Sequence, residues 1–205
     1  TQGARGTSIL IVETKDCPGF RVGRVLDKLG MKSQDTSELF FDDVTVPAAN
    51  LLGGNEGQGF FQLMGDLPYE RLIIGVTALA CMEGAYEATL AYVRERKAFG
   101  ATLWDKQAIR QRMAMRAAQV AAARQLVYHA AWLDAQGRDC VKEVSMVKAL
   151  CGELVNDVVY DCQQFHGGFG YMREAAIERM VRDARVQAIG GGATEVMLEE
   201  VAKRL

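Results

Sequence analysis

The sequence predicts an α+β protein: the C-terminal part of an antiparallel β domain at residues 1–50, followed by an all-α, up-down four-helix bundle domain at residues 51–205. Two observations predict this fold class. Residues 1–50 carry short runs of β-branched and aromatic residues between Pro, Gly and Asp turn signals, which is typical of strands. After Pro47 and the glycine-rich segment "LLGGNEGQG", the hydrophobic period changes to that of helices and stays helical.

Three strand-like runs make up the first part, at residues 7–13, 20–26 and 38–46. A set of three strands leaves sheet edges and one face uncovered, so we expect them to be the tail end of a larger sheet. The chain also opens on Thr1 with strand-like residues and without an initiator Met. We therefore expect a fragment of a longer protein.

Four long helical runs and one short helix are predicted in the second part. Their residue ranges are 57–96, 105–136, 139–165, 173–186 and 194 onward. Pro68 predicts a kink or break within the first run, because proline lacks a backbone donor and crowds the preceding turn. Gly137 predicts the end of the second run. Runs of this length favour an antiparallel bundle.

The composition limits the classes of partner. Lys plus Arg total 24 against 26 for Asp plus Glu, so the net charge of −2 gives no global field for nucleic acid or an anionic membrane. The longest uncharged apolar stretch, Leu72–Met82, is too short to span a bilayer. With two histidines and no C-x-x-C pair among five cysteines, we expect neither a metal site nor a disulfide framework. Free cysteines favour a reducing compartment, and we expect the bacterial cytoplasm rather than the mitochondrial matrix.

The stretch "DLPYERLIIGV", residues 66–76, places Glu70 at the head of an apolar helix, just after Pro68. One interpretation is structural, because the helix macrodipole favours acidic residues in the first turn and proline suits a helix start. The spacing favours a second interpretation. The residues at +3, +4, +7 and +11 from Glu70 are apolar or small and share its helical face: Ile73, Ile74, Thr77 and Cys81. A carboxylate on such a face is a candidate for chemistry.

Three further motifs occur in a fixed order along the helical part. They are "RERKAFG" at 94–100 with Gln107 seven residues further on, "QFHGGFGYMRE" at 164–174 and "RDARVQAIGGGATEVM" at 182–197. Together with "LLGGNEGQGFFQLMGDLPYERL", this combination closely resembles the C-terminal half of the acyl-CoA dehydrogenase family over essentially the whole chain. The resemblance implies FAD as cofactor, held between domains and between subunits of a homotetramer or homodimer.

The resemblance also implies which residues contact FAD. The resemblance implies that Arg96, Phe99 and Gln107 reach the FAD of a neighbouring subunit. Gln164, Gly167 and Gly168 resemble a second FAD segment of the family. A guanidinium offers paired donors to pyrophosphate oxygens, and glycine permits a close approach of the backbone. Structural alternatives stay open: Arg96 suits a helix C-terminus, Phe99 suits a core, and "HGGFG" suits a turn that closes a helix. We expect His166 to be a hydrogen-bonded buried or interfacial residue rather than a catalyst.

The segment "IGGGATE" departs from the family at its catalytic position. In short- and medium-chain members a glutamate lies where this chain has Gly191. In long-chain and isovaleryl members that glutamate is also a glycine and the base comes from the helix that bears "ERL", so Glu70 resembles the catalytic base. Substrate-binding residues are then Arg71, Gly191 and Gly192, and Thr194 and Glu195 resemble flavin contacts, whereas Ala193 replaces a threonine.

The implied reaction is the α,β-dehydrogenation of an acyl-CoA thioester in fatty acid β-oxidation, with Glu70 removing the α-proton. We expect the apolar stripe to desolvate Glu70, and the backbone N–H of Gly191 to face the thioester oxygen. Electron-transferring flavoprotein is the implied electron acceptor. Two alternatives stay open: an acyl-CoA oxidase or flavin-dependent hydroxylase of the same fold, and a non-catalytic helical oligomerisation module.

Overall fold

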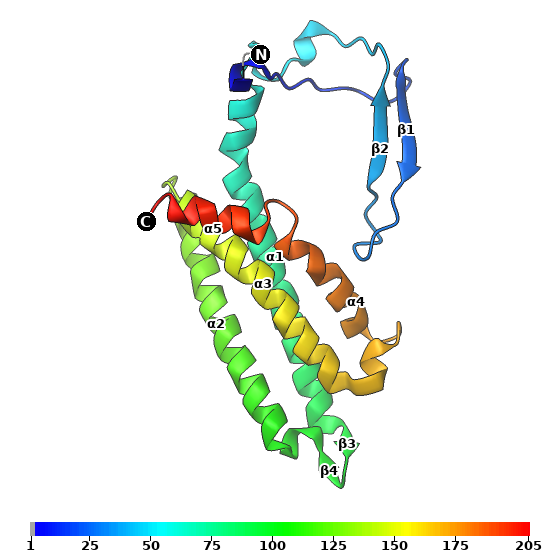
Figure 1. Cartoon of the computed structure of the whole chain (residues 1–205), viewed down its shortest axis with the longest axis vertical. Coiled ribbons are helices and arrows are strands. Elements are labelled where there is room, and N and C mark those ends of the chain that lie inside the picture. The colour runs from blue at the N-terminus through cyan, green and yellow to red at the C-terminus, as the bar shows by residue number, and fades with distance from the viewer. Residues whose placement is uncertain (1–2) are drawn as a thin grey trace. The chain divides into compact units, whose positions relative to one another are not determined.

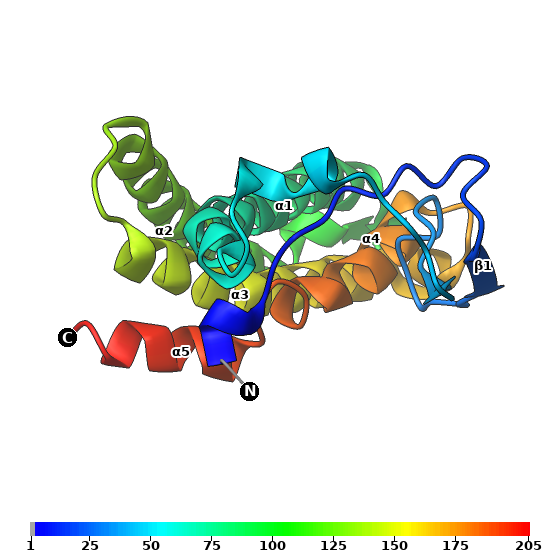
Figure 2. The same ribbon diagram turned by 90° about the horizontal axis from the view of Figure 1, so that it is seen from above.

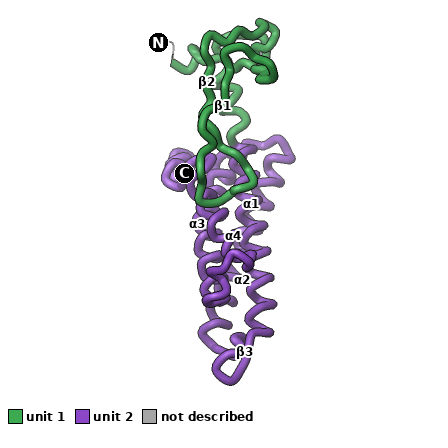
Figure 3. Tube along the Cα trace, turned by 90° about the vertical axis from the view of Figure 1, so that its right-hand side faces the viewer, with its two compact units in different colours: residues 1–67 green, residues 68–205 purple. Residues whose placement is uncertain are grey.

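The computed structural model describes residues 3–205, which divide into two compact units, residues 3–67 and Pro68–Leu205 (Figure 3). A small antiparallel sheet lies in the first unit and a bundle of helices in the second, so the predicted fold class is confirmed (Figure 1). Helix α1, Gly59–Glu95, crosses the division between the units. The domain boundary at residue 50 stays a prediction.

The first unit contains one hairpin. Strand β1, Phe20–Val25, pairs antiparallel with strand β2, Ser37–Phe41, with an irregular register at Gly23. A Cβ at Gly23 would lie 2.6 Å from the ring of Phe40, so a larger residue would push the two strands apart. The hairpin leaves apolar side chains on the surface, as expected for a small piece of sheet: Val22, Val25, Leu39 and Phe41.

The strand predicted at residues 7–13 is wrong. This segment runs extended but forms only one isolated bridge, between Leu10 and Leu51. Its partner region consists of two short 3₁₀ helices, Ala48–Asn50 and Leu52–Gly54, which present too few aligned backbone groups for a ladder. A β propensity without a pairing partner does not make a strand.

Helix α1 continues through Pro68 without a break. Pro68 lacks the N–H that would have donated to the carbonyl of Met64, so the helix loses one backbone hydrogen bond there and still continues. By length and composition, α1 is the one helix among residues 3–205 that could cross a membrane. This is weak evidence, because core helices meet the same criterion and α1 supplies Leu72, Leu79 and Met82 to the core.

The second unit is an up-down bundle of α1, α2 (Gln107–Ala135) and α3 (Val141–His166) (Figure 1). The chain reverses between α1 and α2 through an unpredicted hairpin, with strands β3 at Lys97–Ala98 and β4 at Ala101–Thr102. It reverses again at Gly137, as predicted, where a φ of 64° ends α2 in a left-handed turn.

Helix α3 is the central element of the bundle. It packs against α2, against α4 (Ala176–Ala184) and against α5 (Thr194–Ala202), which follows the 3₁₀ turn Arg185–Ala188 (Figure 2). Gly152 permits a close approach of the 3₁₀ turn to α3, because a Cβ there would lie 2.8 Å from the carbonyl oxygen of Gln187. The buried residues of α3 extend along most of its length: Val144, Val147, Cys151, Val155, Val158 and Cys162.

Candidate functional site

A glycine turn lies between Arg185–Ala188 and helix α5. Gly191 has a φ of 68° and Gly192 a φ of 122°, values that residues with side chains rarely adopt. Packing adds a second reason for glycine, since a Cβ at Gly191 would lie 2.2 Å from Cδ1 of Ile74 and one at Gly192 would lie 2.7 Å from Cε of Met197. The turn therefore lies directly against helix α1.

The turn contacts the same face of α1 that carries Glu70. Glu70 and Ile74 are four residues apart on helix α1, so their side chains are neighbours on one face. Helical side chains point back toward the preceding turn of their own helix, which for Ile74 is the one that contains Glu70. Arg71 Nε donates a hydrogen bond to the carbonyl oxygen of Gly191 at 3.1 Å. The structure therefore brings together Arg71, Gly191 and Gly192, and Glu70 lies one helical turn before Ile74, the residue that meets Gly191.

The expected desolvation of Glu70 by its helical face is not seen in this chain. Glu70, Ile73 and Thr77 are exposed, while Ile74 and Cys81 are half-buried. The buried stripe of α1 contains other residues, such as Leu72 and Leu79, and it faces the bundle core instead. Glu70 itself lies on an exposed part of this face, although Ile74 on the same face contacts the glycine turn.

Residues of α3 and α5 complete the surroundings of the glycine turn. Lys148 is fully buried, and its Nζ donates to the carbonyl oxygen of Gly192. Burial lowers the pKa of Lys148, whereas the nearby carboxylates of Glu153 and Glu195 act in the opposite direction. Sequence reasoning missed Lys148, although a single lysine inside the apolar run "VSMVKALC" was a signal of a buried, partnered charge.

Thr194 and Glu195 begin helix α5 beside this turn. The Thr194 hydroxyl lies 2.6 Å from Oε1 of Glu153 and donates to it, so its proton is engaged within the chain and its lone pairs remain for a further donor. Glu195 is exposed in the first turn of α5. Their assignment as flavin contacts stays a prediction.

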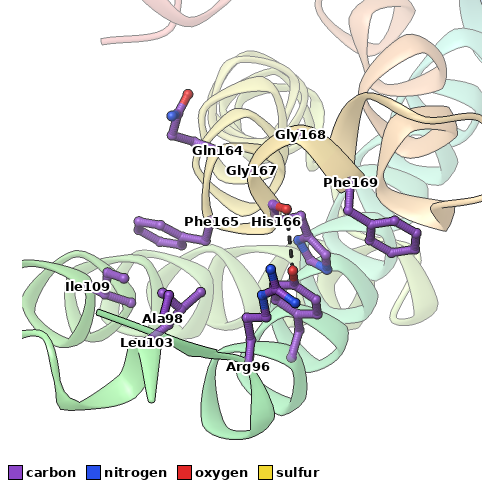
Figure 4. A pocket seen from close by; sticks show the side chains of 11 residues that line it. Arg96, Ala98, Leu103, Ile109, Gln164, Phe165, His166, Gly167, Gly168 and Phe169 are labelled. Carbon is purple, nitrogen blue, oxygen red and sulfur yellow. Dashed lines mark hydrogen bonds between the residues drawn. The ribbon is translucent and has the colours of Figure 1, made fainter. Parts of the chain in front are cut away.

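A second cluster of candidate residues lines an open cleft of about 760 Å³ at the other end of α3 (Figure 4). Arg96, Gln164, Gly167 and Gly168 all line it, so four of the six residues predicted to contact FAD near these motifs share one cleft. The side chains of Arg96 and Gln164 lie at opposite edges of the cleft. The remaining lining is largely apolar or aromatic: Tyr92, Ala98, Leu103, Ile109, Phe165, His166 and Phe169.

The wall of the cleft is fixed by His166. Its ring stacks on Tyr92 with centroids 4.3 Å apart, and its Nδ1 lies 2.9 Å from the carbonyl oxygen of Cys162. Because a carbonyl only accepts, Nδ1 carries a proton in this arrangement. Tyr92 in turn donates from its hydroxyl to the His166 carbonyl at 3.4 Å (Figure 4). His166 is half-buried and hydrogen-bonded, as expected, and its exclusion as a catalyst stays a prediction.

The two positions that follow His166 differ in whether their backbone conformation favours glycine. Gly167 ends α3 with a φ of 59°, a value that itself favours glycine. Gly168 has no such backbone constraint, and a Cβ on either glycine would meet no atom within 4 Å. Nothing within residues 3–205 therefore demands a glycine at 168, whereas a group bound in the cleft would.

Phe99 and Gln107 lie outside the lining of this cleft. Phe99 occupies the tip of the β3–β4 hairpin with a φ of 54°, and it is 93% exposed. Gly100 follows with a φ of 78°, so the pair forms the two central positions of a type I′ turn. The alternative in which Phe99 is a core residue is wrong, because its ring contacts solvent. Gln107 is exposed at the first position of α2.

Comparison with known proteins places the chain in a family. The profile of the acyl-CoA dehydrogenase C-terminal domain matches residues 57–205. The long-chain specific acyl-CoA dehydrogenase of pig (Sus scrofa) mitochondria is 44% identical over 202 residues, 98% of this chain and 46% of that protein. An acyl-CoA dehydrogenase of Bacillus subtilis is 41% identical over 204 residues, 100% of this chain and 53% of that protein.

The structural comparison agrees with the sequence comparison. The crystal structure of a probable acyl-CoA dehydrogenase from Mycobacterium abscessus superposes with a TM-score of 0.95 at 43% identity, over 98% of this chain and 53% of that chain. The chain belongs to the acyl-CoA dehydrogenase family. It spans about half the length of the curated relatives that it matches.

The cleft fits the FAD that the acyl-CoA dehydrogenase family implies. Gly167 and Gly168 leave free the space that a Cβ would take, and Arg96 is an exposed cation suited to pyrophosphate oxygens. Apolar and aromatic residues line most of the rest, as in other cofactor sites. Within residues 3–205, in contrast, no group of three or more His, Cys, Asp and Glu side chains is placed to hold a metal ion.

Proposed function

We propose that this chain is part of an FAD-dependent acyl-CoA dehydrogenase that converts an acyl-CoA thioester to the trans-2-enoyl-CoA, with Glu70 as the catalytic base. One observation carries the proposal: the turn at Gly191 packs against the face of α1 that bears Glu70. The position where other family members carry the base is a glycine here, and Glu70 lies one helical turn before the residue that contacts this glycine, Ile74, so the two features explain each other. The 44% identity to a long-chain specific enzyme supports this placement.

Glu70 is the group proposed to remove the α-proton. That proton is only weakly acidic, so a base must lie within hydrogen-bond reach and work best when water is excluded. Glu70 is exposed in this chain, and we propose that the bound thioester covers it. A carboxylate that is no longer solvated by water is a stronger base.

The turn is proposed to stabilise the negative charge that develops on the thioester oxygen. Within residues 3–205 the N–H of Gly191 donates to no protein acceptor, so it is available for this oxygen. Because Gly191 provides a backbone donor and no side chain, the base can lie on α1 while the donor stays in the turn. Bound FAD would accept the β-hydrogen as hydride, and we propose Arg96, Gln164, Gly167 and Gly168 as the residues of this chain that hold it.

Substitution of Glu70 tests the assignment of the base. In the complete FAD-loaded enzyme, Glu70→Gln should still bind acyl-CoA within a few-fold of the unaltered affinity, because the shape is kept. Flavin reduction should slow by about 10²–10⁴, the usual contribution of a general base. Stopped-flow bleaching of the flavin absorbance measures the rate. Glu87→Gln, at another exposed position of α1, is the matched control and should behave as the unaltered enzyme. Normal bleaching in Glu70→Gln would show that another group is the base.

The electron acceptor and the assembly are also proposals. We propose electron-transferring flavoprotein as the acceptor and a homotetramer or homodimer as the assembly. Reoxidation of the reduced enzyme with electron-transferring flavoprotein, compared with air, separates a dehydrogenase from an oxidase or hydroxylase. A complete protein that takes up no FAD would instead indicate a non-catalytic module.

A further inference from the structure

The backbone of the glycine turn is held by cations from two different helices. Lys148 of α3 donates to the carbonyl oxygen of Gly192, and Arg71 of α1 donates to that of Gly191 at 3.1 Å. These are consecutive carbonyls in a segment of three consecutive glycines, residues 190–192, and a glycine-rich backbone is otherwise among the least constrained kinds. Two charge-assisted hydrogen bonds therefore fix a segment that its sequence alone leaves loose.

Burial of the Lys148 ammonium group carries a cost in free energy. The side chain is 0% exposed on a helix face whose other members are Val144, Val147 and Cys151. Burying an ammonium group requires strong compensation, and burial lowers the pKa of Lys148 for this reason. The charged groups around it are Glu153 of α3, Glu195 of α5 and Arg71 of α1. An apolar residue would fill the same space without that cost, so the contact with the turn requires an explanation.

The two contacts fix the peptide planes that follow Gly191. Arg71 fixes the plane between Gly191 and Gly192, and Lys148 fixes the plane between Gly192 and Ala193, because each peptide group is rigid. On the preceding side, the N–H of Gly190 donates to the Val186 carbonyl at 2.7 Å. The plane that carries the N–H of Gly191 is thereby held by Arg71 on one side and by the Gly190–Val186 bond on the other, while Lys148 holds the next plane, which is joined to the one that Arg71 fixes. The N–H of Gly191 itself remains free to donate.

We propose that Lys148 is a positioning residue for the reaction: by anchoring the Gly192 carbonyl, it aims the N–H of Gly191 at the position of the thioester oxygen. This inference rests on the proposed function. An oriented donor matters most when charge develops on the oxygen, so Lys148 should affect the transition state more than substrate binding. A lysine that only supported the fold would not produce this difference.

Lys148→Met tests the proposal in the complete FAD-loaded enzyme. Methionine keeps an unbranched side chain of similar volume and removes the donor and the charge. Lys142→Met, on the same helix but with its ammonium near the surface, is the matched control. We expect kcat to fall between about tenfold and a hundredfold with KM changed less than threefold, a loss below that for outright removal of an oxyanion donor. The control should leave both constants unchanged.

Hydrogen exchange provides a second measurement that does not depend on activity. In Lys148→Met, the amides of residues 189–196 should exchange faster, whereas those of α2 should keep their protection. If Lys148→Met does not fold, Lys148→Gln serves for both measurements, because its neutral amide is cheaper to bury but too short to hold the carbonyl in the same way.

Three results would overturn the proposal. Unchanged exchange would show that Lys148 does not hold the turn. Faster exchange with unchanged kcat would show a purely structural anchor, and equal effects on KM and kcat/KM would place Lys148 in substrate binding. Failure of the proposed function is visible separately, because the unaltered enzyme would then not be reduced by any acyl-CoA, and the role of Lys148 in the reaction would fall with it.

Discussion

Position 191 is restricted to glycine by its own backbone and by one neighbouring side chain. A φ of 68° disfavours any residue with a Cβ, by about 1–2 kcal/mol. The terminal methyl of Ile74 also occupies the space that a Cβ would need, at 2.2 Å. The proposed transfer of the base from Glu70 to position 191 therefore requires a shift of the Ile74 side chain as well as the exchange of two residues.

The exchange of base positions makes this argument testable. We expect the double variant Glu70→Gly/Gly191→Glu to recover little activity, because the new side chain meets Ile74 and adopts a strained φ. Adding Ile74→Ala removes the steric part and should raise the rate of flavin reduction about tenfold above that of the double variant, equivalent to about 1.4 kcal/mol.

Ile73→Ala is the control for the added substitution, since Ile73 is the neighbouring residue on α1 and is exposed. It should give no gain in the same double-variant background. If the double variant were already as active as the triple one, steric exclusion by Ile74 would be ruled out as the reason for glycine at 191.

The exposed tip of the β3–β4 hairpin gives a residue-level prediction about the cofactor. Phe99 adopts a φ of 54°, which asparagine tolerates better, and it is almost fully exposed. Phe99→Asn should therefore leave the thermal midpoint of the FAD-free protein unchanged or slightly raised. If Phe99 contacts a flavin, the same variant should lose FAD during gel filtration, measured as the ratio of flavin to protein absorbance.

Tyr171→Asn is the matched control, because Tyr171 is also highly exposed but lies outside the cleft that holds Arg96 and Gly168. It should retain FAD as the unaltered enzyme does. Equal FAD retention in Phe99→Asn would contradict the assignment of Phe99 as a flavin contact.

Helices α2 and α3 are joined by a buried ion cluster around Asp161. The Asp161 carboxylate accepts from Nε of Arg116 at 2.7 Å and from Nη1 of Arg112 at 3.2 Å. The side chains of Asp161 and Arg116 are only 6% and 13% exposed. Removing one member of such a cluster leaves a buried charge without its partner, which is more damaging than loss of a surface pair.

Asp161→Asn should lower the free energy of unfolding by about 3 kcal/mol. Asp157→Asn removes a carboxylate that also pairs with Arg116 but is mostly exposed, and it should cost less than about 1 kcal/mol. Urea unfolding followed by helical circular dichroism measures both. Similar losses in the two variants would show that burial of the cluster does not determine its contribution.

The helical elements followed from the sequence because periodicity is a local signal. To predict the end of α2 at Gly137, it was enough to know that glycine permits the left-handed conformation. The β3–β4 hairpin was missed, since two-residue strands are shorter than any period. The predicted strand at residues 7–13 failed for the opposite reason: its residues suit a strand, but pairing depends on a distant segment, here one that contains Leu51.

The site shows the same division between local and distant information. The pairing of Glu70 with Gly191 followed from resemblance, and the contact of Gly191 with Ile74 is consistent with it. The anchoring of the turn by Lys148 did not follow, because residues 148 and 192 meet only through the packing of α3 on α5. Exposure of Glu70 was also missed, since periodicity shows which residues share a face but not what covers that face.

At the scale of the whole molecule, the reactivity of the cysteine thiols shows which of the two compact units opens. Cys151 and Cys162 lie in the core of the second unit, and burial raises the pKa of each thiol to about 11. Cys17 lies half-buried in the first unit, outside regular structure. Since the thiolate is the reactive form, the two buried thiols should resist alkylation for two reasons, a low thiolate fraction and lack of access.

We therefore expect iodoacetamide at pH 8 to label Cys17 in the absence of urea, and to label Cys151 and Cys162 only as urea unfolds the bundle. A pKa about two units above the ordinary value of 9.0 reduces the thiolate fraction about a hundredfold. Raising the pH to 9.5 increases that fraction but not access, so labelling of both buried thiols should still follow the loss of helical circular dichroism, with one shared urea midpoint. Mass spectrometry of the labelled peptides gives each rate, and full unfolding should make all five cysteines react.

Labelling of Cys151 at the rate of Cys17 in native buffer would mean that the bundle opens locally around α3, and a core that loose would not hold Lys148 against the glycine turn.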